Sequence, residues 1–157
     1  NSASLKSSHF GNAYLRGTDL SNCDIIGADM SGADLTEANL NKSKLNWVSF
    51  NSAKLSGANL SGVELIGTDF RYADLSKAAN LSAKQLRNVL TLYKCLLPSE
   101  IDATSLKKSQ PLLFVKPRRW FAIMAKKAMT TLIKDAIPTT LKLKNLSFSY
   151  LYFYKEA

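Results

Sequence analysis

A five-residue repeat runs through the first half of this chain and constrains its fold more than any other feature. An apolar residue occupies every fifth position from Leu5 to Leu75, fifteen in all, without a miss. Two positions before each of them stands a small or short-branched residue, as Ala33 stands before Leu35. A period of five fits neither the 3.6-residue turn of a helix nor the two-residue alternation of a long strand. It fits a short extended segment followed by a turn, repeated many times.

The other positions of the repeat predict which way each side chain points. Residues two apart in extended backbone share a face, so Ala33 and Leu35 point inward and the intervening Asp34 points outward. Two positions after the apolar residue comes a corner that suits the positive φ of a type II turn. Six of the seven glycines take that corner position: Gly17, Gly27, Gly32, Gly57, Gly62 and Gly67.

A second period, of twenty residues, indicates how many segments close one coil. The bulky residues Phe10, Met30, Phe50 and Phe70 are twenty apart. Charges alternate at the same spacing in two outward columns, Asp24–Lys44–Glu64 and Asp34–Lys54–Asp74. Stacked coils lie about 4.8 Å apart, where opposite charges attract and like charges repel. Both observations predict a coil of four sides.

The tandem A(D/N)L-x-x units, as in ADMSGADLTEANL of residues 28–40, resemble the pentapeptide-repeat family. The resemblance covers residues 1–98. It implies an all-β solenoid, namely a right-handed quadrilateral β-helix of about four coils that ends in a short C-terminal capping helix. Since solenoids carry their function on the outer surface, the resemblance predicts the fold more closely than the activity.

The repeat loses register at Asn80, where a helix signal follows. Ser82 and Gln85 have the spacing of a capping box, and Leu81 can pack on Leu86. We expect a helix over residues 83–90 that closes the end of the β-helix, with a domain boundary at 98.

Residues 99–157 are expected to form a basic, aromatic-rich tail of mixed helix and strand. The tail holds eleven Lys and Arg against four acidic residues, whereas residues 1–98 hold ten against eight. An amphipathic helix is predicted from Lys116 to about Ala136, and an alternating pattern predicts a strand over residues 146–154. No family is recognised in the tail.

The sequence gives little support for an enzymatic function. The single histidine, His9, points outward while Ser8 points inward, and the carboxylates are spread over four sides. Metal-ligand spacing and a phosphate-binding glycine loop are missing from the sequence. We therefore expect no catalytic residues, metal, cofactor or small-molecule substrate.

Cys23 and Cys95 both fall at or near inward positions, which favours buried thiols over a disulfide. This favours a cytoplasmic location, although the lack of an initiator methionine leaves a processed or secreted origin open. No apolar run reaches the eighteen residues that a membrane-spanning helix needs, so no transmembrane segment is expected.

Two candidate partner-binding sites emerge. On the solenoid, Ile26 and Ile66 replace the usual polar residue just after the inward centre, and Asn46 and Trp47 lie between them. In the tail, charge and aromatic rings combine; the residues there are Lys116, Arg118, Arg119, Trp120 and Phe121.

These features predict a non-enzymatic scaffold that presents a rigid β-helix face to a protein partner or a larger complex. The basic tail docks on that partner or on its own solenoid. One alternative is a topoisomerase-binding mimic of DNA, of the quinolone-resistance type that the family resemblance implies. Another is binding of nucleic acid or an anionic membrane through the tail. The apolar stripe expected in the tail favours protein, because phosphates cannot bury it.

Overall fold

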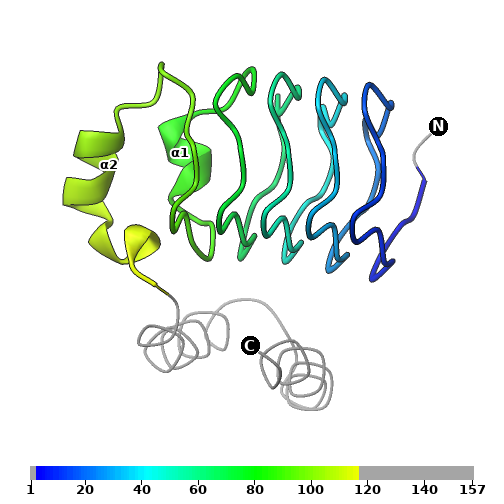
Figure 1. Cartoon of the computed structure of the whole chain (residues 1–157), viewed down its shortest axis with the longest axis horizontal. Helices are drawn as coiled ribbons and strands as arrows, with labels where there is room; N and C mark the ends of the chain where they lie inside the picture. Colours follow the sequence, from blue (N-terminus) through cyan, green and yellow to red (C-terminus); the bar gives the residue numbers. More distant parts are fainter. Residues whose placement is uncertain (1–2, 117–157) are drawn as a thin grey trace, which may run out of the picture. The chain divides into compact units, whose positions relative to one another are not determined.

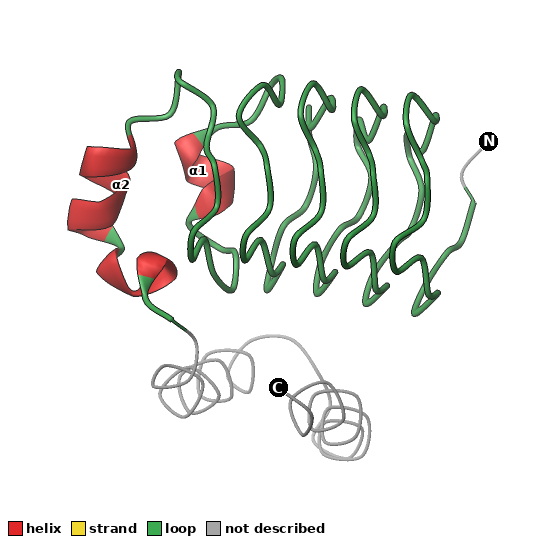
Figure 2. Cartoon of the chain, viewed as in Figure 1, coloured by secondary structure: helices red, strands yellow, loops and turns green. Residues whose placement is uncertain are grey.

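The computed structural model of the chain describes residues 3–116. These residues form a stack of turns followed by two α-helices, α1 (Ala83–Leu86) and α2 (Ala103–Ser109), and a 3-10 helix, η1 (Pro111–Phe114) (Figures 1 and 2). The described residues belong to the first compact unit of the chain, Asn1–Pro117. None of the helices described is long and apolar enough to cross a bilayer.

The stack is built from single parallel bridges between residues twenty apart. Ser4 pairs with Asp24, Asp24 pairs with Lys44, and the offset holds as far as Asn59 with Ala79. Each bridge carries two backbone hydrogen bonds: Asp24 N–H donates to Ala3 O at 2.9 Å, and Leu5 N–H donates to Asp24 O at 2.7 Å. The offset confirms that four five-residue sides close one coil.

The backbone at the corners has the positive φ that the position of the glycines predicted. All six corner glycines have φ between 63° and 75°. The turn hydrogen bond is also present, as in Ser8 N–H to Leu5 O at 3.3 Å. Other corners carry ordinary residues with positive φ, including Trp47 at 63° and Tyr72 at 56°. The bulky residues at these two corners therefore sit in a conformation that glycine adopts at lower cost.

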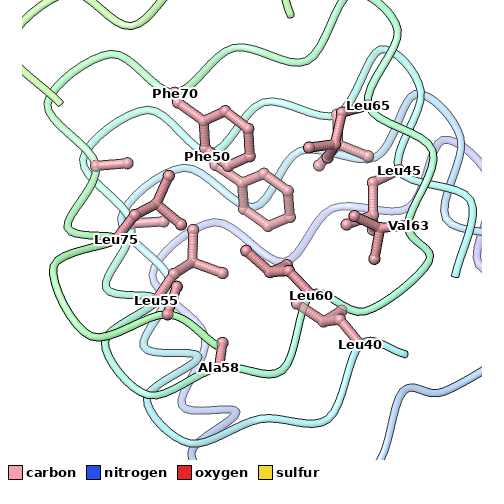
Figure 3. Close-up of a cluster of buried hydrophobic side chains, with 14 of the residues drawn as sticks. Leu40, Leu45, Phe50, Leu55, Ala58, Leu60, Val63, Leu65, Phe70 and Leu75 are labelled. Atoms are coloured by element: carbon pink, nitrogen blue, oxygen red, sulfur yellow. The ribbon is translucent and has the colours of Figure 1, made fainter. Parts of the chain in front are cut away.

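The inward columns form the hydrophobic core. Ile25, Met30, Leu35 and Leu40 are fully buried, as are the corresponding residues of the next coil. The Phe50 and Phe70 rings stack with centroids 5.4 Å apart and planes 6° apart (Figure 3). This contact confirms the aromatic column expected from the twenty-residue spacing.

At the outward position between the two inward residues, Asp and Asn have a local role that periodicity alone did not reveal. The Oδ1 atom accepts a hydrogen bond from the backbone N–H two residues later, for example Asp34 from Thr36 at 3.1 Å and Asn59 from Ser61 at 3.1 Å. Such a bond stabilises the turn that follows the extended segment. A short side chain with an acceptor oxygen explains the preference for Asp or Asn here, although Lys44 and Lys54 show that the fold does not require it.

At the end of the repeat, α1 begins with the capping box expected of Ser82 and Gln85. The helix ends at Leu86, earlier than the predicted 90, because the following residues pair with the previous coil. Gly67 N–H donates to Asn88 O at 2.9 Å, and Leu90 N–H donates to Thr68 O at 2.8 Å. Bridging then resumes with an offset of 22, as in Asp69 with Thr91.

The chain beyond residue 98 continues to pack against the core. Ile101, Leu106 of α2 and Leu113 of η1 are buried in the same hydrophobic cluster as the β-helix. Leu113 O accepts a hydrogen bond from Leu92 N–H at 2.6 Å. The predicted boundary at 98 therefore falls inside the first compact unit, since the apolar side chains of α2 and η1 complete its core. The helix predicted to continue to 136 and the strand of 146–154 lie outside the described residues.

Candidate protein-binding surface

Three of the predicted solenoid residues form a column along one side of the β-helix. Backbone hydrogen bonds connect the coils beside it: Gly27 N–H to Asn46 O at 3.0 Å and Trp47 N–H to Ile66 O at 2.8 Å. Ile26 is half-buried, and Ile66 is 47% exposed. The structure thus brings Ile26, Asn46 and Ile66 together, as expected from their twenty-residue spacing. We call these three residues, together with Trp47, the Trp47 surface.

Asn46 holds the centre of this surface in place. Its Oδ1 accepts a hydrogen bond from Ile66 N–H at 2.8 Å, and its Nδ2 donates to Glu64 Oε2 at 2.8 Å. The bond to Ile66 takes the place of the one that the repeat usually makes within a single unit, since position 64 carries Glu. Asn46 therefore fixes the backbone under the exposed Ile66 side chain.

The Trp47 indole packs over the next corner, Gly67. A Cβ atom at Gly67 would overlap the six-membered ring of the indole, and Gly67 itself is buried. Gly67 also has φ of +70°, so two constraints demand glycine there. Trp47 is half-buried in this position and lies beside Ile66 in sequence register. A large, rigid aromatic ring next to an exposed isoleucine is the composition of an interaction hot spot.

The column next to this surface carries alternating charge. Asp24, Lys44 and Glu64 are joined by parallel bridges, and Lys6 Nζ lies 3.1 Å from Asp24 Oδ2. Burial would raise the pKa of Asp24, but hydrogen bonds from Lys6 and Ile26 N–H and the charge of Lys44 outweigh it, so the pKa is lowered. The apolar surface is therefore bordered by charges of both signs.

The predicted tail site falls largely outside the described residues. Lys116 is exposed at the end of the described chain. Arg118, Arg119, Trp120 and Phe121 lie beyond it, so the structure describes none of their contacts.

A second corner also carries an aromatic residue, Tyr72, which was not among the predicted site residues. The Tyr72 and Tyr93 rings meet edge to face at 5.6 Å, and Lys94 Nζ lies 5.8 Å from both ring centroids. Tyr72 occupies the same corner position of its unit as Trp47 does. The criterion that identified Trp47, an aromatic residue at a corner that glycine usually occupies, applies equally to Tyr72.

Between residues 3 and 116 no three His, Cys, Asp or Glu side chains cluster so that they could hold a metal ion. His9 is exposed on the first turn. Both cysteines are free thiols, and burial, helped by the charge of Asp74, raises the pKa of Cys95 to about 12. A thiol that stays protonated at neutral pH is a poor nucleophile.

The repeat segment also matches a known family. Residues 3–41 and 43–78 match the family model of pentapeptide repeats in eight copies. Proteins with these repeats form right-handed quadrilateral β-helices, in agreement with the four-sided turns seen here. No curated protein matches the chain.

Several solved structures are similar. The pentapeptide repeat protein Rfr23 from the cyanobacterium Cyanothece 51142 is 35% identical, with a TM-score of 0.45; the alignment covers 49% of this chain and 51% of that one. A pentapeptide repeat protein from the Arabidopsis thaliana thylakoid lumen is 30% identical over 55% of each chain, with a TM-score of 0.41. QnrB1, a plasmid-mediated fluoroquinolone resistance protein, is 19% identical with a TM-score of 0.38, covering 73% of this chain and 66% of that one. The chain thus spans about half the length of the first two.

Proposed function

Because its repeat region, residues 3–78, belongs to the pentapeptide-repeat family, we propose that this chain is a non-enzymatic scaffold that binds a protein partner through the Trp47 surface. The observation that carries the proposal is the aligned column of Ile26, Asn46 and Ile66 beside the indole of Trp47. Asn46 holds this surface in place by donating a hydrogen bond to Glu64 and accepting one from Ile66 N–H. A rigid surface loses little conformational entropy on binding.

The partner that fits this surface is a protein with an apolar patch of its own. The exposed Ile66 and the uncovered part of the half-buried Trp47 gain free energy when a partner removes them from water, and phosphate groups cannot provide that burial. The bordering column alternates in sign, so it does not select a strongly charged partner. The same alternation opposes mimicry of DNA, which needs a continuous row of negative charge.

The proposal is tested by quantitative affinity purification with mass spectrometry, using the 157-residue chain as bait. Ile66→Asp places a charge at the most exposed apolar residue of the surface and should abolish capture of the specific partner. Ser56→Asp makes the same change at the equivalent position of another side and serves as the control. Equal capture by the two variants would refute the choice of surface.

The role of the tail is tested in the same experiment by a chain that ends at residue 116. A chain that ends at 116 keeps α2 and η1, whose leucines belong to the core. A chain that ends at 98 would lose these leucines and expose the core. We expect the shortened chain to retain partner capture, at reduced level if the tail also contacts the partner. Steeply salt-dependent nucleic acid binding that disappears on truncation would instead favour the nucleic-acid alternative.

A further inference from the structure

A cleft lies between the last turn of the β-helix and α2, at the end of the stack where the two α-helices are (Figure 1). Its volume is about 520 Å³, which is within the range of sites for small molecules. Residues 92–98 of the last turn line one side, and Ala103 and Lys107 of α2 and Phe114 of η1 line the other. None of the lining residues belongs to the Trp47 surface, so the cleft is a separate site.

The cleft contains apolar surface that remains in contact with water. Leu96 pairs with Asp74 in the ladder, so it stands at an outward position that carries Asp34, Lys54 and Asp74 in the preceding coils. This leucine is 59% exposed, and Phe114 on the opposite side is half-buried. An apolar ligand that covers both side chains would gain free energy from their removal from water.

The cleft also carries positive charge that is not neutralised within the described chain. Its lining includes two lysines and no acidic residue. Lys94 Nζ lies 5.8 Å from the ring centroids of Tyr72 and Tyr93, and Lys107 Nζ lies 5.3 Å from that of Phe114. Neither ammonium group forms an ion pair with a carboxylate among residues 3–116. Since the aromatic rings position both cations at the cleft, the site favours an anion.

The backbone of the cleft offers little to a bound peptide. Five lining residues already donate their N–H groups within the fold, namely Leu92, Tyr93, Cys95, Leu96 and Ile101. A peptide would bring several polar groups into the cleft, and polar groups that are buried without partners cost free energy. A ligand whose polar atoms are confined to one end avoids this cost.

We propose that the cleft binds a small apolar molecule with a single carboxylate, of which a medium-chain fatty acid is the simplest example. The hydrocarbon part contacts Leu96 and Phe114, and the carboxylate accepts hydrogen bonds from the ammonium groups of Lys94 and Lys107. Charge argues against the rest of the chain as the occupant, because residues 117–157 hold eight Lys and Arg against two acidic residues.

Binding is tested by isothermal titration calorimetry of the 157-residue chain with octanoate, below the concentration at which it forms micelles. We expect saturable binding at one site. Octanamide has the same chain without the charge and should bind at least about fivefold more weakly. Butanoate has four fewer methylene groups to bury and should bind at least about tenfold more weakly. Lack of saturable octanoate binding, or equal binding of octanoate and octanamide, would overturn the proposal.

Paired variants locate the ligand. Lys94→Gln combined with Lys107→Gln should weaken octanoate binding at least about fivefold. Lys42→Gln combined with Lys84→Gln removes two charges from exposed lysines outside the cleft and should leave the affinity unchanged. Equal effects of the two pairs would mean that octanoate binds by net charge alone, and the proposal would be wrong. Binding by a chain that ends at 116 but not by the 157-residue chain would also overturn it, since the tail would then be the occupant.

Discussion

At the scale of single residues, the inward position of the repeat is the most constrained. Leu35 is fully buried between coils, with neighbours above and below in its column. Leu15 stands in the same column one coil earlier but is only partly buried. Loss of a side chain costs most where the cavity cannot be filled by water or by movement of the surroundings.

Leu35→Ala should therefore reduce the free energy of unfolding by about 2–5 kcal/mol. Leu15→Ala removes the same atoms at the open end and should cost clearly less. Chemical denaturation followed by circular dichroism measures both. Equal losses would show that the first turn is as well enclosed as the second, against the burial seen here.

Gly67 is constrained both by its backbone and by the Trp47 ring above it. Gly67→Ala should cost more than the roughly 1–2 kcal/mol expected for a side chain in left-handed backbone, because the new methyl group also displaces the indole. Gly17→Ala is the control, since φ there is +65° and no atom lies within 4 Å of the added Cβ. In a Trp47→Ala background the difference between the two glycine sites should vanish; a difference that persists would mean that the ring does not pack on Gly67.

At the scale of elements, the Gln85 side chain joins α1 to the β-helix by hydrogen bonds, while Leu86 is buried in the core. Gln85 Oε1 accepts from Ser82 N–H at 3.0 Å, and its Nε2 donates to Leu60 O at 3.3 Å and to Val63 O at 3.4 Å. The capping box was predicted from the sequence, but the bonds to the previous coil were not. They depend on which coil lies beneath the helix, and the local spacing of Ser82 and Gln85 does not contain that information.

Gln85→Glu separates the helix-capping role of Gln85 from its hydrogen bonds to the previous coil. The carboxylate still accepts the cap hydrogen bond but cannot donate to the two carbonyls, so the variant should lose about 1–3 kcal/mol of stability. Ser82→Ala removes the cap alone and should lose about 0.5–2 kcal/mol. Thermal and denaturant unfolding give both values. If Gln85→Glu proved neutral, the bonds to Leu60 and Val63 would not stabilise the end of the β-helix.

The turn-stabilising carboxylates give the stability a dependence on pH. Hydrogen bonds from the Thr36 hydroxyl and backbone N–H hold the pKa of Asp34 below its ordinary value of 3.8. The pKa of Asp74 is lowered in the same way by Ser76. Since the folded pKa is lower than the unfolded one, the stabilisation is complete above the unfolded value and is lost as the pH falls through the folded value.

Stability should therefore decrease as the pH falls below about 4. Asp34→Asn retains an oxygen that can accept a hydrogen bond from Thr36 N–H, just as Asn39 accepts one from Asn41 N–H in its own unit. Because the amide does not titrate, the variant should flatten this decrease in stability. Unfolding curves between pH 2 and pH 7 test it. A variant with the same pH dependence as the wild type would show that Asp34 does not contribute.

At the scale of the whole molecule, the sequence predicts the repeated part well and the rest less well. The five- and twenty-residue periods are local, and each coil repeats the same contacts, so Leu35 or Phe50 can be placed without knowing the remainder of the chain. The burial of Leu106 and Leu113 occurs once and depends on how α2 packs on the last turn. The five-residue repeat ends before these residues and cannot predict their burial. The change in composition at Ser99 predicted a domain boundary instead.

The candidate surface was predicted to a similar extent. Spacing alone placed Ile26, Asn46 and Ile66 in one column, because neighbours in a solenoid are set by the period. Spacing could not predict that Asn46 bonds to both Ile66 and Glu64, or that the indole of Trp47 lies over Gly67. Those contacts depend on side-chain rotamers, and the period does not specify them.

The central claim, that this protein binds a protein partner through the Trp47 surface, is tested most directly by hydrogen–deuterium exchange of the purified complex. We expect partner binding to slow exchange in peptides that contain residues 45–48 and 65–68, and to leave residues 35–38 and 55–58, on another side of the same coils, unchanged. Protection confined to residues 35–38 and 55–58, or absent from all four segments, would contradict the account.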